Sequence, residues 1–173
     1  MMLNKNEQAE YAQAYFIQAQ VDRDFALRVY DQLVRNTPER HDEFFCCIVA
    51  HCQQAIEKAT KGFLLRHGAT FRLTHQVIDW IFHTKGQAKY KRLLKDRLDP
   101  RVLAAAIEIE KLAPTLDSSR KNTEYPYLAS RAGKIEIQIP AKTFKAPEVI
   151  AALKAARMVV AAMLRVPNSR SIN

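Results

Sequence analysis

The chain has 173 residues, of which 48% are hydrophobic and 26% are charged, and this balance fits one globular domain with its own core. No apolar h-region opens the sequence and no apolar stretch reaches the length of a membrane span, so we expect a cytoplasmic protein that is neither secreted nor membrane-spanning. The formal net charge of +9 suits an acidic partner such as RNA or a nucleotide, but it does not bear on the fold.

Only four Gly and seven Pro are present, and this composition favours helices over a strand-and-turn architecture. The three cysteines, Cys46, Cys47 and Cys52, are an odd number on one predicted helix and imply no disulfide framework. Cys47 and His51 share a helix face, but no second pair completes a metal site. We therefore expect small core thiols, no metal and no cofactor.

A long first helix is predicted from about residue 7 to residue 35. Its apolar positions fall three or four residues apart, with Gln18 as the one polar interruption. These positions are Tyr11, Ala14, Tyr15, Val21, Phe25, Val29 and Leu33. Thr37 and Pro38 then favour a stop and a new helix start, because Thr caps helices well and Pro suits the first helical position.

The second predicted helix runs from near Pro38 to Arg66, and the short connection before it favours an antiparallel hairpin. Its apolar residues recur at helical spacing and should form one buried stripe: Val49, Cys52, Ile56, Ala59 and Phe63. Gln53, Glu57 and Lys61 follow the neighbouring stripe at four-residue intervals. Glu57 and Lys61 have the favourable order for a helical ion pair. Gly68 is placed to end the helix in the left-handed conformation.

Three further helices complete the prediction. A short apolar one follows Thr74 and runs from Val77 to about Lys85, a fourth begins at Pro100 and stops at Pro114, and the last covers residues 146–166. The basic segment of residues 86–99, between the third and fourth helices, is either a solvated face or a surface that steers nucleic acid. Alternation of Ile135, Ile137 and Ile139 with polar residues predicts a short strand or hairpin inserted before the last helix.

A set of residues spread over these elements resembles the signature of the HEPN domain family. The set comprises Gln53, Gln54, Ala55, Glu57, Lys58, Lys61, Gly68, Thr74, His75 and the later Tyr125, Pro126 and Tyr127. The resemblance covers roughly residues 7–166, leaves 167–173 as a tail, and departs from the family pattern at Thr60 and Gly62. It implies a single all-α domain over residues 1–173, an up-and-down bundle of about five helices that is commonly a homodimer.

The family includes RNA-cleaving toxins, whose chemistry uses an Arg followed at a short interval by a His. In this sequence Arg120 matches the Arg, but Tyr125 stands where the His is expected. Tyr has an unperturbed pKa near 10 and is a poorer general base than His at neutral pH. The resemblance therefore implies a non-cleaving nucleotide- or RNA-binding or regulatory module, in which Arg120, Asn122, Tyr125 and Tyr127 contact the ligand.

Two alternatives remain open at this point. One is a toxin-type, metal-independent endoribonuclease that uses Arg120 with Tyr125 as an altered partner, and the other is a helical interaction scaffold without a small ligand. The family also includes partners of minimal nucleotidyltransferases, in which a tyrosine at the position of Tyr127 can accept AMP. A packed aromatic side chain is the simpler expectation for Tyr127.

We expect structural roles for four other residues. Gln53, Glu57, Lys61 and His75 should support the fold, His75 at the start of the third helix. Arg120 either recognises phosphate or pairs with Glu57. Arg35 and His41 match the catalytic spacing literally, but the helix boundary between them already accounts for both.

Overall fold

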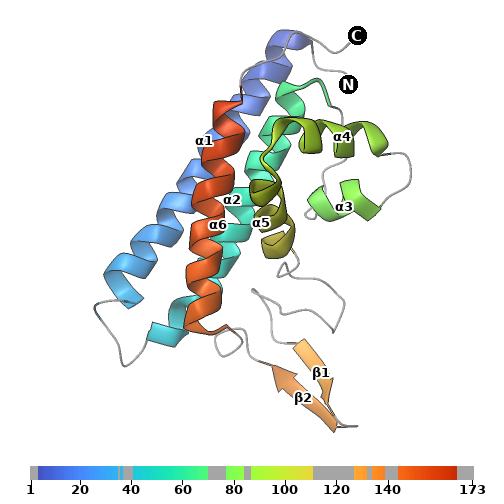
Figure 1. Ribbon diagram of the computed structural model, residues 1–173. Coiled ribbons are helices and arrows are strands. Elements are labelled where there is room, and N and C mark those ends of the chain that lie inside the picture. The colour runs from blue at the N-terminus through green and yellow to red at the C-terminus, as the bar shows by residue number, and fades with distance from the viewer. Residues whose placement is uncertain are drawn as a thin grey trace.

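The computed structural model describes residues 4–34, 36, 41–69, 77–83, 87–110, 127–131, 134–138 and 144–166. Three long helices lie side by side: α1 (Lys5–Val29), α2 (Phe45–Arg66) and α6 (Ala146–Arg165). Helices α2 and α6 run in the same direction and α1 runs against them, as Figure 1 shows. The two most extensive helix–helix packings join α1 to α2 and α2 to α6. The predicted helical bundle is confirmed.

Three shorter helices cover another side of α2. These are α3 (Val77–His83), α4 (Ala88–Arg97) and α5 (Pro100–Glu110), and α5 packs against both α2 and α6. The basic segment is thus a helix, and the apolar third helix buries Val77, Ile78 and Ile81 as its composition predicts. Within the described ranges, no helix combines the length and the hydropathy that a bilayer crossing requires.

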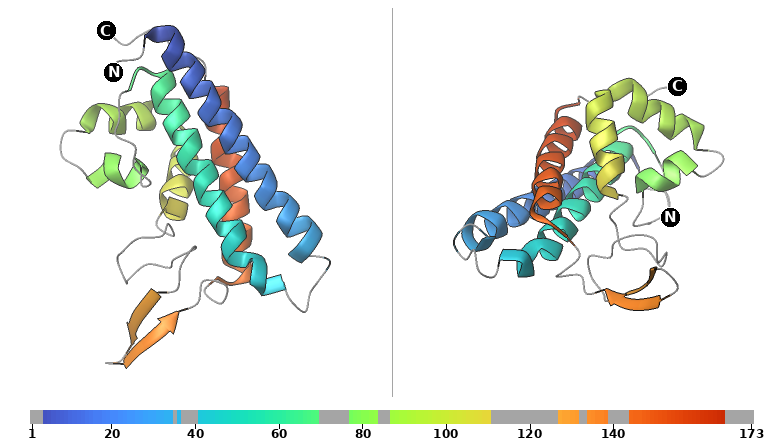
Figure 2. Two further views of the ribbon diagram at one scale, coloured as in Figure 1. Left: turned by 180° about the vertical axis from the view of Figure 1, so that it is seen from behind. Right: turned by 60° about the horizontal axis from the view of Figure 1, so that its bottom comes forward.

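The predicted insertion before the last helix is an antiparallel hairpin of β1 (Tyr127–Arg131) and β2 (Lys134–Gln138). Tyr127 pairs with Gln138 at its open end and Arg131 pairs with Lys134 at its turn. Both views in Figure 2 place the hairpin beyond one end of the helical bundle. Ile139, which belonged to the predicted strand, lies outside the described residues.

Both ends of the α1–α2 connection are less regular than the sequence predicts. The first helix continues past α1 as a single wider turn, Tyr30–Val34, and α2 is preceded by a tight 3₁₀ turn, His41–Phe44.

The start of α1 is capped by Asn4, whose side chain accepts hydrogen bonds from the backbone N–H groups of Asn6 and Glu7. Such a cap satisfies donors that have no partner within the helix.

The predicted core stripe of α2 is fully buried, with Val49, Cys52, Ile56, Ala59 and Phe63 each at most 2% exposed. Helix α1 meets it with small residues seven apart, Ala12, Ala19 and Ala26, and with Phe16. Gly62 on α2 allows this approach, since a Cβ there would lie 3.0 Å from the Ala12 carbonyl oxygen. The two helices therefore pack by close backbone approach.

The apolar stripe that predicts α1 is not the face that packs on α2. Tyr15 and Val29 of this stripe are half-buried, but other members are exposed, together with Ile17. We call this surface the α1 outer face: Tyr11, Ala14, Ile17, Val21 and Phe25. The core-facing residues of α1 are mostly alanines, which contribute little to a hydrophobic pattern. Large exposed apolar side chains gathered along one helix are typical of an interaction surface.

Gly68 ends α2 as predicted, with φ at 76°. Its N–H donates to the Leu65 carbonyl at 3.0 Å, and the Ala69 N–H donates to the Leu64 carbonyl at 2.9 Å. These two bonds form a Schellman motif, which requires a left-handed residue at this position.

We predict that Gly68→Ala lowers the free energy of unfolding by about 1 kcal/mol, because a Cβ disfavours the left-handed conformation. No atom lies within 4 Å of that Cβ, so the loss is conformational rather than steric. Urea unfolding of the two proteins measures it. Gly68→Asn is the matched control and should lose less, since Asn tolerates this conformation; equal losses would contradict the explanation.

Candidate functional site

A buried carboxylate on α1 joins the two longest helices. Asp22 is 4% exposed, and its Oδ2 accepts a hydrogen bond from Lys58 Nζ at 2.5 Å. Its Oδ1 lies 3.3 Å from His51 Nδ1. Lys58 and His51 are seven residues apart, two turns of α2, and therefore reach the same carboxylate. We call these three residues the Asp22 cluster.

The Asp22 cluster is charged at neutral pH. Burial alone would raise the pKa of Asp22, but the hydrogen bonds from His51 and Lys58 and the charge of Lys58 leave it below its ordinary value. Hydrogen bonding to Asp22 and then to Cys47 raises the pKa of His51 to about 9. The ring of Phe25 lies 4.3 Å from the His51 ring, between centroids, and shields it from solvent. One carboxylate thus faces two cations.

A second polar group lies on α2 beside the core. Lys61 is only 6% exposed and its Nζ lies 2.5 Å from Glu57 Oε1, as the spacing predicts. The same ammonium group is 5.9 Å from the centroid of the Tyr15 ring on α1. Burial, and then the hydrogen bond with Tyr11, raises the pKa of Tyr15. This phenol therefore stays protonated at neutral pH.

Gln53 makes a contact to a different helix. Its Nε2 donates to the carbonyl of Ile109 on α5, at 3.4 Å. The neighbouring Gln54 accepts a long hydrogen bond from Lys58, at 3.5 Å. The polar residues of α2 therefore hold α1 on one side and α5 on the other. The long polar side chains that follow the stripe beside the core, Gln53, Glu57 and Lys61, thus make contacts within the domain.

Helix α4 presents an exposed row of cations, Lys89, Arg92 and Lys95, which are three residues apart and so share one face. We call this row the α4 basic face. Both nearby carboxylates are engaged: Asp96 pairs with Arg92 at 3.3 Å, and Asp99 accepts from the Arg101 backbone N–H at 2.7 Å. In the described part of the chain, Lys89 and Lys95 have no acidic partner.

A family model described as HEPN domain matches residues 39–166, well over half of the chain. The chain belongs to the HEPN domain family. Neither the curated proteins nor the solved structures that were compared gave a match. The HEPN match begins just before α2, so α1 and its Asp22 precede the matched region.

The HEPN signature residues divide into two groups in the structure. Gln53, Glu57 and Lys61 lie on α2 with the contacts described above. Arg120, Asn122, Tyr125 and His75 lie outside the described residues, so the pairing of Arg120 with Glu57 stays a prediction. Tyr127 is described in its backbone alone, as the first residue of β1. The candidate ligand contacts of Arg120, Asn122, Tyr125 and Tyr127 therefore stay predictions from the sequence.

The other candidate residues have simpler contexts. His41 begins the 3₁₀ turn before α2, and Arg35 lies outside the described residues. His51 contacts Asp22, and within the described ranges no group of three or more His, Cys, Asp or Glu could hold a metal ion. Cys46, Cys47 and Cys52 are free thiols.

Asp22 is a buried charged residue that was not predicted from the sequence. It interrupts the alanine-rich face of α1, and an acidic residue on a core-facing stripe is a signal of a buried ion pair.

We predict a pH dependence of stability that arises from His51. Its pKa of about 9 in the folded protein exceeds the unfolded value of 6.5, so its contribution is full below pH 6.5 and is lost as pH rises toward 9. The stability difference between the wild-type protein and His51→Asn should therefore shrink over that interval. Urea unfolding at pH 6 and pH 8.5 measures it.

His51→Asn is a suitable variant because Asn keeps an N–H donor near Asp22 but does not titrate. Both proteins have the same three cysteines, so the residue at position 51 is the one titratable residue in which they differ. A difference that stays constant from pH 6 to pH 8.5 would contradict the role assigned to His51.

Proposed function

We propose that this HEPN domain is a non-cleaving RNA-binding module whose α4 basic face contacts the phosphate backbone. The observation that carries the proposal is the unbalanced charge of α4, where Lys89 and Lys95 project into solvent while Asp96 and Asp99 are engaged locally. A row of cations on one helix face is suited to a polyanion, because each neutralised phosphate releases condensed counterions. The net charge of +9 favours the same class of partner.

The packing of α4 supports this role. Leu93, Leu94 and Leu98 are buried and fix the helix on the domain, so its cations are presented on a rigid support. Lys91 lies 5.0 Å from the centroid of the Phe82 ring on α3, which holds the flank of the helix. A rigid cationic row loses less conformational entropy on binding than cations on a loop.

For RNA binding we predict that Lys89→Gln/Lys95→Gln weakens the affinity for a fluorescent single-stranded RNA. For this double variant the slope of log affinity against log salt concentration should decrease in magnitude by about 1 to 1.5, since each single-strand phosphate contact contributes about 0.7 to that slope. Fluorescence anisotropy across a salt series measures both quantities.

The matched control is Lys145→Gln/Arg165→Gln, which removes two exposed positive charges at the ends of α6. It changes the net charge equally but leaves α4 intact, so it should keep most of the affinity. Equal weakening in both variants would mean that net charge alone attracts RNA. Unchanged binding in the α4 variant would exclude this face.

The non-cleaving part of the proposal is supported by the sequence of the Arg120–Tyr127 loop. With Tyr125 at the place of the family's His, the loop has no general base that is half-ionised near neutral pH. The alternative, a toxin-type endoribonuclease, would need Tyr125 to act with Arg120 despite its high unperturbed pKa.

We predict that the purified protein leaves single-stranded RNA intact and that Tyr125→His creates or raises cleavage, because His restores a base near its pKa. Denaturing gels of labelled RNA provide the measurement. Arg120→Ala is the control in both backgrounds. Cleavage by the wild-type protein that Arg120→Ala abolishes would favour the ribonuclease over the binding module.

We propose further that the domain forms a homodimer through the α1 outer face. Ile17 and Val21 are 53% and 54% exposed at its centre, which is uncommon for aliphatic residues on a monomer. Glu10 and Arg28 flank the face and have no ion-pair partner among the described residues. An antiparallel pairing of two copies about residue 19 would bring Glu10 of one chain opposite Arg28 of the other.

We predict that Val21→Glu converts the dimer to a monomer, since it introduces two like charges at the centre of a twofold interface. Size-exclusion chromatography with light scattering measures the mass. Ala104→Glu, at an exposed position on α5, is the matched control and should remain dimeric. A monomeric wild-type protein at micromolar concentration, or a dimeric Val21→Glu, would exclude this interface.

A minimal nucleotidyltransferase is the protein partner that we propose on the family resemblance. Tyr127 at the open end of the hairpin would be the residue that accepts AMP. The hairpin lies beyond one end of the bundle (Figure 1). Incubation with such an enzyme and ATP, followed by mass spectrometry of the peptide that contains Tyr127, tests this partner.

A further inference from the structure

A groove between α1 and α6 is lined by none of the residues of the α4 basic face. It has a volume of about 600 Å³ and is lined by residues of these two helices: Arg23, Asp24, Leu27, Lys154, Arg157, Met158 and Ala161. We propose that this α1–α6 groove binds a phosphate monoester, with Arg23 and Arg157 holding the phosphate and the apolar wall holding the organic group.

The charge of the lining favours a dianion. Three cations and one carboxylate line the groove, so its formal charge is +3 − 1 = +2. A phosphate monoester carries close to two negative charges at neutral pH and would balance it. Two guanidinium groups that share one groove repel each other, and a bound phosphate converts that repulsion into two charge-assisted interactions.

The side chains of the two arginines differ in how firmly they are held. Arg23 is held by its neighbour Asp24, with Nε and Nη2 each 2.8 Å from the same oxygen, Oδ1. This contact fixes the guanidinium plane and leaves its other N–H groups unused. Arg157 is exposed and makes no ion pair within the described residues. One arginine is thus oriented in advance, and the other can close on the ligand.

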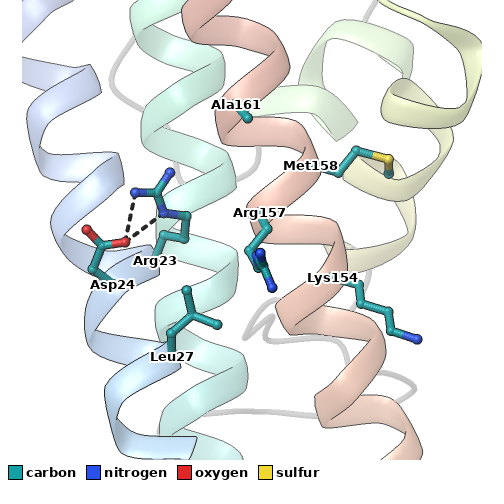
Figure 3. Close-up of a pocket in the computed structure, with 7 residues that line it drawn as sticks. All are labelled: Arg23, Asp24, Leu27, Lys154, Arg157, Met158 and Ala161. Carbon is teal, nitrogen blue, oxygen red and sulfur yellow. Dashed lines mark hydrogen bonds and ion pairs between the residues drawn. The ribbon is translucent and has the colours of Figure 1, made fainter. Parts of the chain in front are cut away.

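Figure 3 shows how the side chains are arranged. Leu27 extends from α1 and Arg157 extends from α6 toward the gap between the helices, while the guanidinium group of Arg23 turns toward Asp24. Lys154 and Met158 extend from the other side of α6, toward α5. In the proposed complex Arg23 and Arg157 hold the phosphate, and Lys154 contributes at longer range.

The rest of the groove suits a small organic body. Leu27 and Ala161 are partly buried, so part of their apolar surface remains available for contact. The volume falls within the range of roughly 300–1,000 Å³ that is common for small-molecule sites. An inorganic anion alone would leave this apolar wall uncovered.

Isothermal titration of the full chain with AMP, ribose 5-phosphate, inorganic phosphate and adenosine tests the proposal. We expect both esters to bind, inorganic phosphate to bind more weakly and adenosine not to bind detectably. The two esters distinguish a ligand that needs a base from one that needs only a phosphorylated sugar. Arg157→Gln and Arg23→Gln should each weaken ester binding by about tenfold or more.

Arg165→Gln is the matched control, because Arg165 is an exposed residue of α6 that does not line the groove. It should bind the esters as the wild-type protein does. Lys89→Gln/Lys95→Gln should also keep ester binding, which separates this site from the α4 basic face. No ester binding, or equal weakening in Arg157→Gln and Arg165→Gln, would overturn the proposal. Inorganic phosphate that binds as tightly as the esters would overturn the role of the apolar wall.

Discussion

The buried carboxylate of Asp22 is the constraint on which the rest of the bundle depends. A charge that is 4% exposed is costly unless it is paired, and only one register of α1 on α2 brings Asp22 to both Lys58 and His51. A shift of one turn would leave an unpaired charge at the interface. The alanine face and Gly62 permit close packing, and the ion pair decides where along the helix that packing occurs.

From α2 the same kind of contact extends to the other helices. Gln53 binds a carbonyl of α5, and the Arg66 guanidinium donates to the Leu164 and Val166 carbonyls at the end of α6. Arg66 also stacks on Phe16 of α1, at 4.1 Å from the ring centroid. One helix therefore organises the domain through polar side chains as well as its apolar stripe. Among the described residues, the surfaces that we propose for partners and ligands lie on α1, α4 and α6.

Much of the fold was predictable from local patterns. Helical periodicity placed the long helices, the αL requirement identified Gly68, and the alternation near Ile135 and Ile137 indicated the hairpin. The Lys58–Asp22 pair was not predictable, because it joins residues 36 apart whose approach depends on helix register. The α1–α6 groove was missed for the same reason. The Arg120–Tyr127 loop rests on the motif alone, since a motif gives residue types and not their geometry.

The two opposite faces of helix α1 differ in the residues they carry. Small residues, Phe16 and one carboxylate face α2, while Ile17 and Val21 face away. Because Ile17 and Val21 are more than half exposed, substitutions at these two positions change the surface with little effect on the core. Related chains could therefore gain, lose or exchange a partner along this helix and keep the same bundle, so the identity of the assembly can diverge faster than the fold.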